Sequence, residues 1–182
     1  MKKFFGLLMG SILLFSCNDS ATSDKKDVET VASESAATPD NEFGDEKYIS
    51  IAKKGLADLA SGDIDSWMSS FADNAVYRWN NLDSLTGKAA IMEYWKKRRA
   101  EVIETLAFSN DIWLSVKVNK SQGYGQLTGN YALSWKQVEA KYKTGKTMTQ
   151  RMHTVFHFDA NDKIDRVTQY MDRASINAAM SK

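Results

Sequence analysis

The chain has 182 residues, of which 43% are hydrophobic and 26% are charged, and its formal charge is +1. This length corresponds to one domain and an additional segment. The near-neutral charge argues against a polybasic nucleic-acid binder, and a single cysteine excludes a disulfide scaffold or a cysteine-cluster metal site. With two histidines in the chain, few ligands remain for zinc, and we expect no metal and no cofactor.

Residues 1–17 have the features of a lipoprotein signal peptide. Lys2 and Lys3 precede a mostly apolar run of twelve residues, which is too short to span a bilayer and typical of a secretory segment. The run ends at Cys17, and the preceding residues, LFS, resemble a bacterial lipobox. We therefore predict that Cys17 is lipidated and holds the chain at a membrane of the bacterial cell envelope. The alternative is an ordinary signal peptide with an incidental cysteine.

Residues 18–45 are expected to form an acidic tether without regular structure. They include eight acidic residues against two lysines and almost no large apolar side chain. Such a segment cannot bury enough apolar surface to compensate its conformational entropy. We therefore place the folded domain at residues 46–182.

Two helices open the predicted domain. Apolar side chains at helical spacing over 46–60 indicate the first helix, and Gly62 can end it in a left-handed conformation. Asp63 can cap the second helix, which we extend to residues 73–74. Its apolar stripe consists of Ile64, Trp67, Met68 and Phe71.

The remaining elements are a strand, a third helix and a series of antiparallel strands. We expect a strand over 75–79, a loop over 80–85 and a helix that Thr86 caps. Alternating patterns predict strands over 112–118, 127–135, 148–158 and 164–172, followed by a short terminal helix. This order indicates an α+β fold in which three N-terminal helices pack on a curved, mostly antiparallel sheet and form a cone with an apolar interior.

Several blocks of this chain resemble the NTF2-like superfamily, which includes SnoaL-like polyketide cyclases and ketosteroid isomerases. They are residues 59–67 (LASGDIDSW), 71–77 (FADNAVY), 86–91 (TGKAAI) and 156–159 (FHFD). The resemblance covers about residues 47–175 and implies a cone-shaped fold, an interior pocket and a homodimer formed through the sheet. It does not imply one activity, because this fold is found in enzymes and non-enzymes.

The resemblance to ketosteroid isomerases does not extend to their catalytic residues. These enzymes use a helix tyrosine, an aspartate base and a second acid. The corresponding positions here are Gly55, Trp79 and Thr154. Glycine and tryptophan cannot transfer a proton in this way, so the isomerase mechanism is not expected.

His153 and Asp172 are the remaining acid/base candidates for a cofactor-independent SnoaL-type reaction. The alternation of the strand, however, places His153 and His157 opposite an apolar face that includes Met152 and Phe156. If that apolar face lines the cone, both histidines point away from the pocket.

A set of aromatic and polar side chains is expected to line the pocket, although single rings of this kind are often only core residues. The set consists of Tyr77, Trp79, Trp95, Trp113, Tyr131, Trp135, Thr154 and Gln169. We predict a lipid-anchored domain that binds a small apolar molecule without catalysis. The alternatives are a SnoaL-type cyclase or isomerase that uses His153 or Asp172, and a dimeric interaction module.

Overall fold

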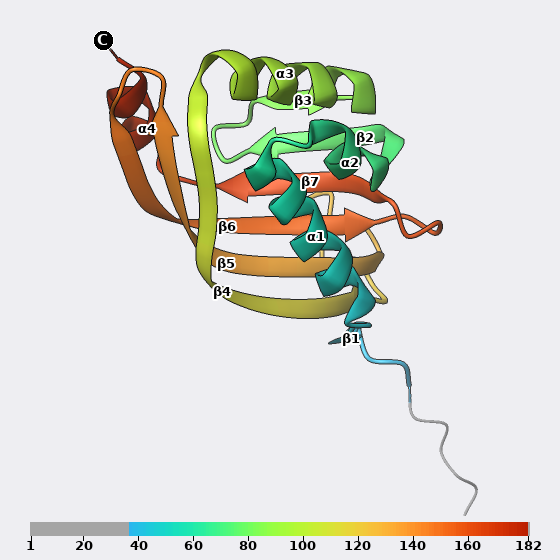
Figure 1. Ribbon diagram of the computed structural model, residues 1–182. Coiled ribbons are helices and arrows are strands. Elements are labelled where there is room, and N and C mark those ends of the chain that lie inside the picture. Colours follow the sequence, from blue (N-terminus) through green and yellow to red (C-terminus); the bar gives the residue numbers. More distant parts are fainter. Residues whose placement is uncertain (1–36, 182) are drawn as a thin grey trace, which may run out of the picture. The chain divides into compact units, whose positions relative to one another are not determined.

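The computed structural model describes residues 37–181 (Figure 1). The predicted signal peptide, Cys17 and most of the predicted tether lie outside the described residues. The helices are α1 (Lys47–Ser61), α2 (Ile64–Ser69), α3 (Lys88–Glu101) and α4 (Arg173–Met180). The strands are β1 (Asn41–Phe43), β2 (Phe71–Trp79), β3 (Ser84–Thr86), β4 (Ile103–Val118), β5 (Gly129–Tyr142), β6 (Thr147–Phe158) and β7 (Ile164–Tyr170).

The strands form one sheet in the order β1-β4-β5-β6-β7-β2-β3. β2 and β7 pair in parallel, and every other neighbouring pair is antiparallel. Figure 1 shows β4, β5 and β6 bending strongly as they approach α4, while α1, α2 and α3 cover one face of the sheet. The predicted α+β cone is confirmed, with a fourth helix beside it.

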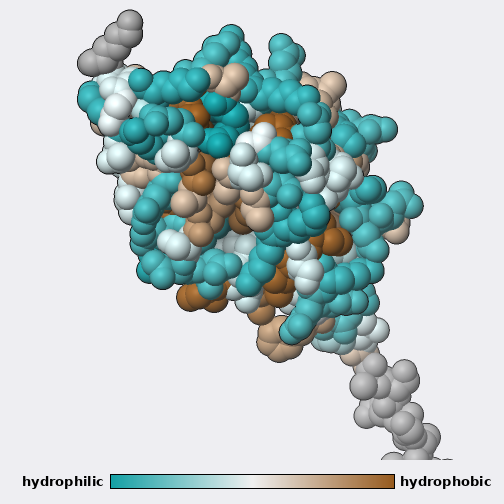
Figure 2. Space-filling view, in the orientation of Figure 1, coloured by the Kyte–Doolittle hydropathy of each residue, from teal (hydrophilic) through white to brown (hydrophobic). Residues whose placement is uncertain are grey.

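The core lies between these helices and the concave face of the sheet. Trp67 of α2 packs edge-on against Phe71 and Trp95, with ring centroids 5.2 and 5.5 Å apart. Tyr77 and Phe156 are each 1% exposed. The outer surface seen in Figure 2 is mostly hydrophilic, and apolar side chains show only in separate patches. No helix within residues 37–181 is long and apolar enough to cross a membrane.

The predicted boundary between the first two helices is confirmed. Gly62 adopts a left-handed φ of 91°, and its N–H donates to the carbonyl oxygens of Asp58 and Leu59. The Asp63 carboxylate accepts a hydrogen bond from the Ser66 N–H at 2.9 Å and caps α2.

Two predicted helix boundaries are wrong. α2 ends at Ser69 rather than at residues 73–74, and β2 already begins at Phe71. Phe71 is 2% exposed, so its place in the apolar pattern is explained equally well by a buried strand. Thr86 does not cap α3: it ends β3, and Gly87, with a φ of 89°, precedes the helix without a side-chain cap.

The end of the predicted tether belongs to the sheet. Asn41–Phe43 pairs with Val116–Val118 of β4, and Lys117 Nζ lies 2.8 Å from Glu42 Oε1. β4 itself begins at Ile103, nine residues before the predicted start. The edge of so long a strand presents unpaired backbone groups, and β1 satisfies part of them.

The predicted terminal helix is confirmed as α4, which closes one end of the cone. The Asp172 carboxylate accepts a hydrogen bond from the Ala174 N–H at 2.8 Å and caps the helix. The Thr144 hydroxyl, in the turn between β5 and β6, donates to the Ala179 carbonyl oxygen at 2.7 Å. These contacts hold α4 against the curved end of the sheet.

Candidate functional site

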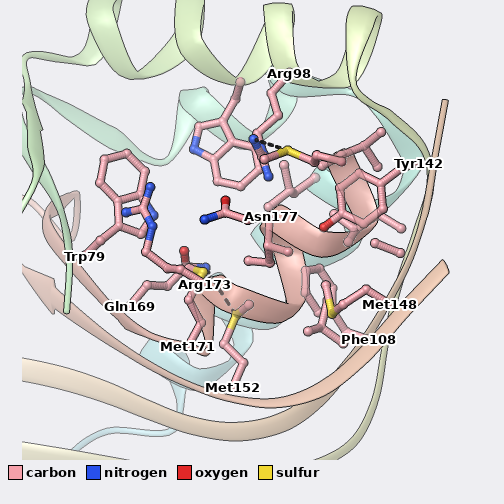
Figure 3. Close-up of a pocket in the computed structure, with 18 of the residues that line it drawn as sticks. Trp79, Arg98, Phe108, Tyr142, Met148, Met152, Gln169, Met171, Arg173 and Asn177 are labelled. Carbon is pink, nitrogen blue, oxygen red and sulfur yellow. Dashed lines mark hydrogen bonds between the residues drawn. The ribbon is translucent and has the colours of Figure 1, made fainter. Parts of the chain in front are cut away.

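A cavity of about 80 Å³ lies between α3, α4 and the concave face of the sheet (Figure 3). Its floor comes from β4, β5 and β6, which bend beneath it, and α4 supplies one wall. The apolar part of its lining consists of Leu59, Trp79, Trp95, Ile103, Leu106, Phe108, Val138, Ala140, Met148, Met152, Met171, Ile176 and Met180. Four of these are methionines, whose flexible side chains let such a wall adapt to different shapes.

Two buried polar atoms of this lining have no partner within the described residues. They are the indole nitrogen of Trp95 and the amide oxygen of Gln169. Gln169 is 3% exposed, and its amide nitrogen contacts the Met152 sulfur at 3.3 Å. Buried polar groups are nearly always hydrogen-bonded, so a free donor and a free acceptor among the residues that line one cavity indicate a place for a ligand.

The side chain of Arg98 adds a positive charge to the wall. It extends from α3 toward the cavity, with its guanidinium 6.0 Å from the Tyr94 ring centroid and Nη1 3.7 Å from the Met180 sulfur. No carboxylate of residues 37–181 lies within 4 Å of it. Arg173, by contrast, is paired with Asp83 at 3.3 Å. Asn177 of α4 completes the polar part of the lining.

Three residues of the predicted pocket set line this cavity: Trp79, Trp95 and Gln169. Tyr77 lies behind them in the core, with its ring centroid 5.0 Å from Trp79 and 5.9 Å from Trp95. The placement of Tyr77 is therefore a correction, since its ring supports the wall but does not form it.

The other four predicted pocket residues lie elsewhere. Trp113 lines a separate cavity beneath α1, and Thr154 is buried next to that cavity, where its hydroxyl accepts a hydrogen bond from Lys136. The prediction that Tyr131 and Trp135 face the interior is wrong. Both rings lie on the outer face of the sheet, where Trp135 stacks on His153 at 4.6 Å and Tyr131 packs against His157.

Neither acid/base candidate reaches the cavity. The His153 ring lies between Trp135 and Tyr170 on the outer face, and its Nδ1 is 3.0 Å from the Ser134 carbonyl oxygen. Partial burial lowers the pKa of His153. Asp172 caps α4, where the Ser175 hydroxyl and the Ala174 N–H lower the pKa of its carboxyl. Neither residue can therefore take the alternative acid/base role in the pocket: His153 points away from the cone, as the apolar opposite face of its strand indicated, and Asp172 caps a helix.

The position that corresponds to the isomerase tyrosine has no room for one. A Cβ atom at Gly55 would lie 2.9 Å from Trp67 Cδ1, so α1 and α2 approach each other too closely for a larger side chain. Within residues 37–181, no group of three histidine, cysteine or acidic side chains is arranged to hold a metal ion.

Sequence reasoning missed Lys136, a fully buried lysine on the concave face of β5. It also missed Arg98 and Asn177. The sequence did contain a signal for Lys136. It alternates along β5 with the same period as Ala132, Ser134, Val138 and Ala140, and these side chains form the side of the strand that points into the cone.

Residues 53–167, more than half of the chain, match the model of the SnoaL-like domain. The chain belongs to this SnoaL-like family. A candidate isomerase of Bacillus subtilis superposes with a TM-score of 0.58 at 20% identity, covering 74% of this chain and 92% of that one. A candidate polyketide cyclase of Xanthomonas campestris gives 0.59 at 15% identity, with 75% and 98% covered.

An NTF2-like protein of unknown function from Burkholderia pseudomallei gives a TM-score of 0.60 at 9% identity, with 74% of this chain and 98% of that chain covered. No curated protein matches the sequence. At these identities the solved structures show the fold that this SnoaL-like domain shares with them, and the cavity lining determines what the domain can bind.

Proposed function

We propose that this SnoaL-like domain binds a small, mostly apolar acid in the cavity between α3, α4 and the sheet. The observation that carries the proposal is the pair of unpartnered buried atoms in the mostly apolar lining, Trp95 Nε1 of α3 and Gln169 Oε1 of β7. Leaving a buried donor and acceptor unsatisfied costs free energy, and a ligand that meets both recovers it.

The charge of the lining favours an acid. Arg98 and the indole N–H of Trp95 are both donors on this wall, and Arg98 has no carboxylate partner within the described residues. A guanidinium matches the geometry of a carboxylate. The amide oxygen of Gln169 can accept a hydrogen bond from a hydroxyl group elsewhere on the ligand.

The size of the cavity limits the ligand. An apolar cavity of about 150 Å³ accommodates benzene, so the 80 Å³ present here holds a compound of that size only if the wall adjusts. The methionine side chains of the lining supply this adjustment. We therefore expect ligands with no more than about one ring.

The lining favours binding over proton transfer. It contains no aspartate, glutamate or histidine, and its ionisable groups are two arginines and two tyrosines. Burial raises the pKa of the Tyr142 hydroxyl, which makes it a weaker acid. Acid/base catalysis near neutral pH needs a group that titrates there.

We further propose that the domain works at the surface of a bacterial envelope membrane, held by lipid on Cys17. The sequence pattern of residues 1–17 supports this placement. The homodimer through the sheet stays a prediction, for which the exposed side chains of Ile112, Trp135 and Tyr170 offer an apolar surface, and light scattering can measure it.

Calorimetric titration of the full chain in phospholipid nanodiscs with benzoate tests the binding proposal. We expect saturable binding of benzoate, weakened about tenfold by Arg98→Met, while Gln169→Leu should weaken only the binding of 3-hydroxybenzoate, about fivefold, because benzoate has no hydroxyl group from which Gln169 Oε1 could accept a hydrogen bond. Gln137→Leu, a matched change on the outer face of β5, should leave the affinity unchanged. Equal binding by all variants, or binding to empty nanodiscs alone, would contradict the proposal.

A further inference from the structure

Lys136 of β5 is completely buried within the cone, at the floor of a second cavity. This cavity, of about 230 Å³, lies beneath α1 and is lined by Leu56, Ala57, Phe108, Asp111, Trp113 and Lys136, together with Lys53 and Ala60. Phe108 lines this cavity and the ligand cavity described above. The cavity is therefore a neighbour of the proposed acid-binding site and does not coincide with it.

Two hydroxyl groups hold the amine of Lys136. Its Nζ lies 2.8 Å from Ser134 Oγ and 2.8 Å from Thr154 Oγ1. Ser134 donates its own proton to the Thr154 carbonyl oxygen at 3.4 Å, so its oxygen accepts from the amine. A neutral amine satisfies both contacts with its two N–H groups and keeps a free lone pair.

The surroundings of Lys136 disfavour its charged form. No carboxylate of residues 37–181 lies within 4 Å of Nζ, and the nearest aromatic rings, Phe108 and Trp113, have their centroids at 5.8 and 6.0 Å. Burial lowers the pKa of Lys136 to about 7, against a small opposing effect of the Asp111 carboxylate. About half of the amine is therefore neutral at physiological pH.

The mouth of the cavity is polar and close to solvent. Lys53 Nζ lies 3.5 Å from Asp111 Oδ2, and the indole N–H of Trp113 donates to the same carboxylate. The ring of Trp113 thereby lies between this ion pair and Lys136. A reactant reaches the amine by displacing Trp113 or Phe108, which favours small molecules.

We propose that Lys136 is a nucleophile that forms an imine with a small apolar aldehyde or ketone in the cavity beneath α1. The amine lone pair attacks the carbonyl carbon, and a proton passes from nitrogen to the carbonyl oxygen, which gives a carbinolamine. The carbinolamine then loses its hydroxyl group with one further proton as water, and a C=N bond forms. Ser134 and Thr154, which already contact Nζ, are placed to relay these protons.

Reductive trapping tests the proposal. The full chain in nanodiscs is incubated with propanal and cyanoborohydride, digested, and mapped by mass spectrometry. We expect Lys136 to be alkylated at least tenfold faster at pH 7 than Lys53 at the mouth of the same cavity. An ordinary lysine is only about 0.03% neutral at this pH, whereas about half of Lys136 is neutral.

The pH dependence of the labelling ratio is the second readout. The ratio of Lys136 to exposed lysines should rise roughly fiftyfold between pH 9 and pH 7, because exposed lysines become protonated while Lys136 stays partly neutral. Because Lys136 and the exposed lysines meet the same reductant in one reaction, the ratio of their labelling rates does not depend on how the reactivity of the reductant changes with pH.

Two variants separate a reactive amine from a merely buried one. Trp113→Ala opens the path and should raise the rate at Lys136, while Thr154→Val keeps the amine but should lower the rate by removing one hydroxyl. If Lys136 stays unmodified in the folded wild-type chain and in Trp113→Ala, while it is labelled after denaturation, the amine is structural and the proposal is overturned. Benzoate binding is unaffected by that result, so the two proposals fail independently.

Discussion

Burying the amine of Lys136 makes the stability of this domain depend on pH in an unusual direction. Its pKa falls from an ordinary value of 10.5 to about 7 in the folded chain. Between these values the unfolded chain binds a proton that the folded chain does not bind, so the free energy of unfolding rises with pH. Below about pH 7 both states are protonated, and the cost of burying the charge is fully present.

The variant Lys136→Met should therefore be more stable than the wild type, and the difference should depend on pH. Methionine fills a similar volume without a charge, so the variant lacks this titration. We expect its advantage to shrink by about 2.5 kcal/mol between pH 6.5 and pH 9. Urea unfolding at the two pH values measures this change, and a constant advantage would show that Lys136 stays protonated in the folded chain at both.

At the level of single residues, the sequence could predict which side chains are large and apolar but not which face they occupy. In β5, Tyr131, Leu133 and Trp135 alternate as a buried face would, yet the opposite face lines the cone. Both faces of this strand are partly covered, because on the outside His153 stacks on Trp135 and Tyr170 stacks on His153. Alternation alone cannot identify the interior when both faces carry apolar groups.

The short helix α4 closes the proposed ligand cavity, and its stability depends on its first turn. Asp172 caps this turn by accepting hydrogen bonds from the Ala174 N–H and the Ser175 hydroxyl. Ile176, Asn177 and Met180 of this helix line the cavity. Any loosening of α4 should therefore weaken ligand binding as well as the helix.

We expect Asp172→Ala to lower the melting temperature by a few degrees and to speed hydrogen exchange of the α4 amides. Asp172→Asn should behave almost like the wild type, because asparagine caps helices equally well. Exchange in α1, which does not contact this cap, serves as the internal reference. Unchanged exchange in α4 of Asp172→Ala would mean that packing alone holds the helix.

Elements with local signals were predicted well, and elements defined by distant pairing were not. Gly62 and Asp63 mark a helix boundary through their own backbone and side chain, so the sequence contains the information. β1 exists because the edge of β4, more than seventy residues away, offers hydrogen-bonding groups. The first half of β4 lacked an alternating pattern because much of it is exposed and Asn110, with a φ of 51°, interrupts the strand.

For the whole molecule, the proposed lipid on Cys17 predicts where the protein is found. Wild-type chain should pellet with the envelope membranes, and Cys17→Ser should lose this attachment because a lipid chain supplies the binding free energy. Fractionation of cells that produce each form, with mass spectrometry of the N-terminal peptide, measures both location and acylation. A Cys17→Ser chain that stays in the membranes at the wild-type level would contradict lipid anchoring through this residue.

The parallel pairing of β2 with β7 has a consequence for how the chain reaches its native state. β2 emerges during synthesis about ninety residues before the strand that covers its inner edge. Until Ile164–Tyr170 is available, β2 and β3 cannot join the rest of the sheet, and contacts this far apart in sequence form slowly. This late pairing would delay completion of the sheet until the whole domain has been synthesised, which is compatible with the export that we propose from residues 1–17.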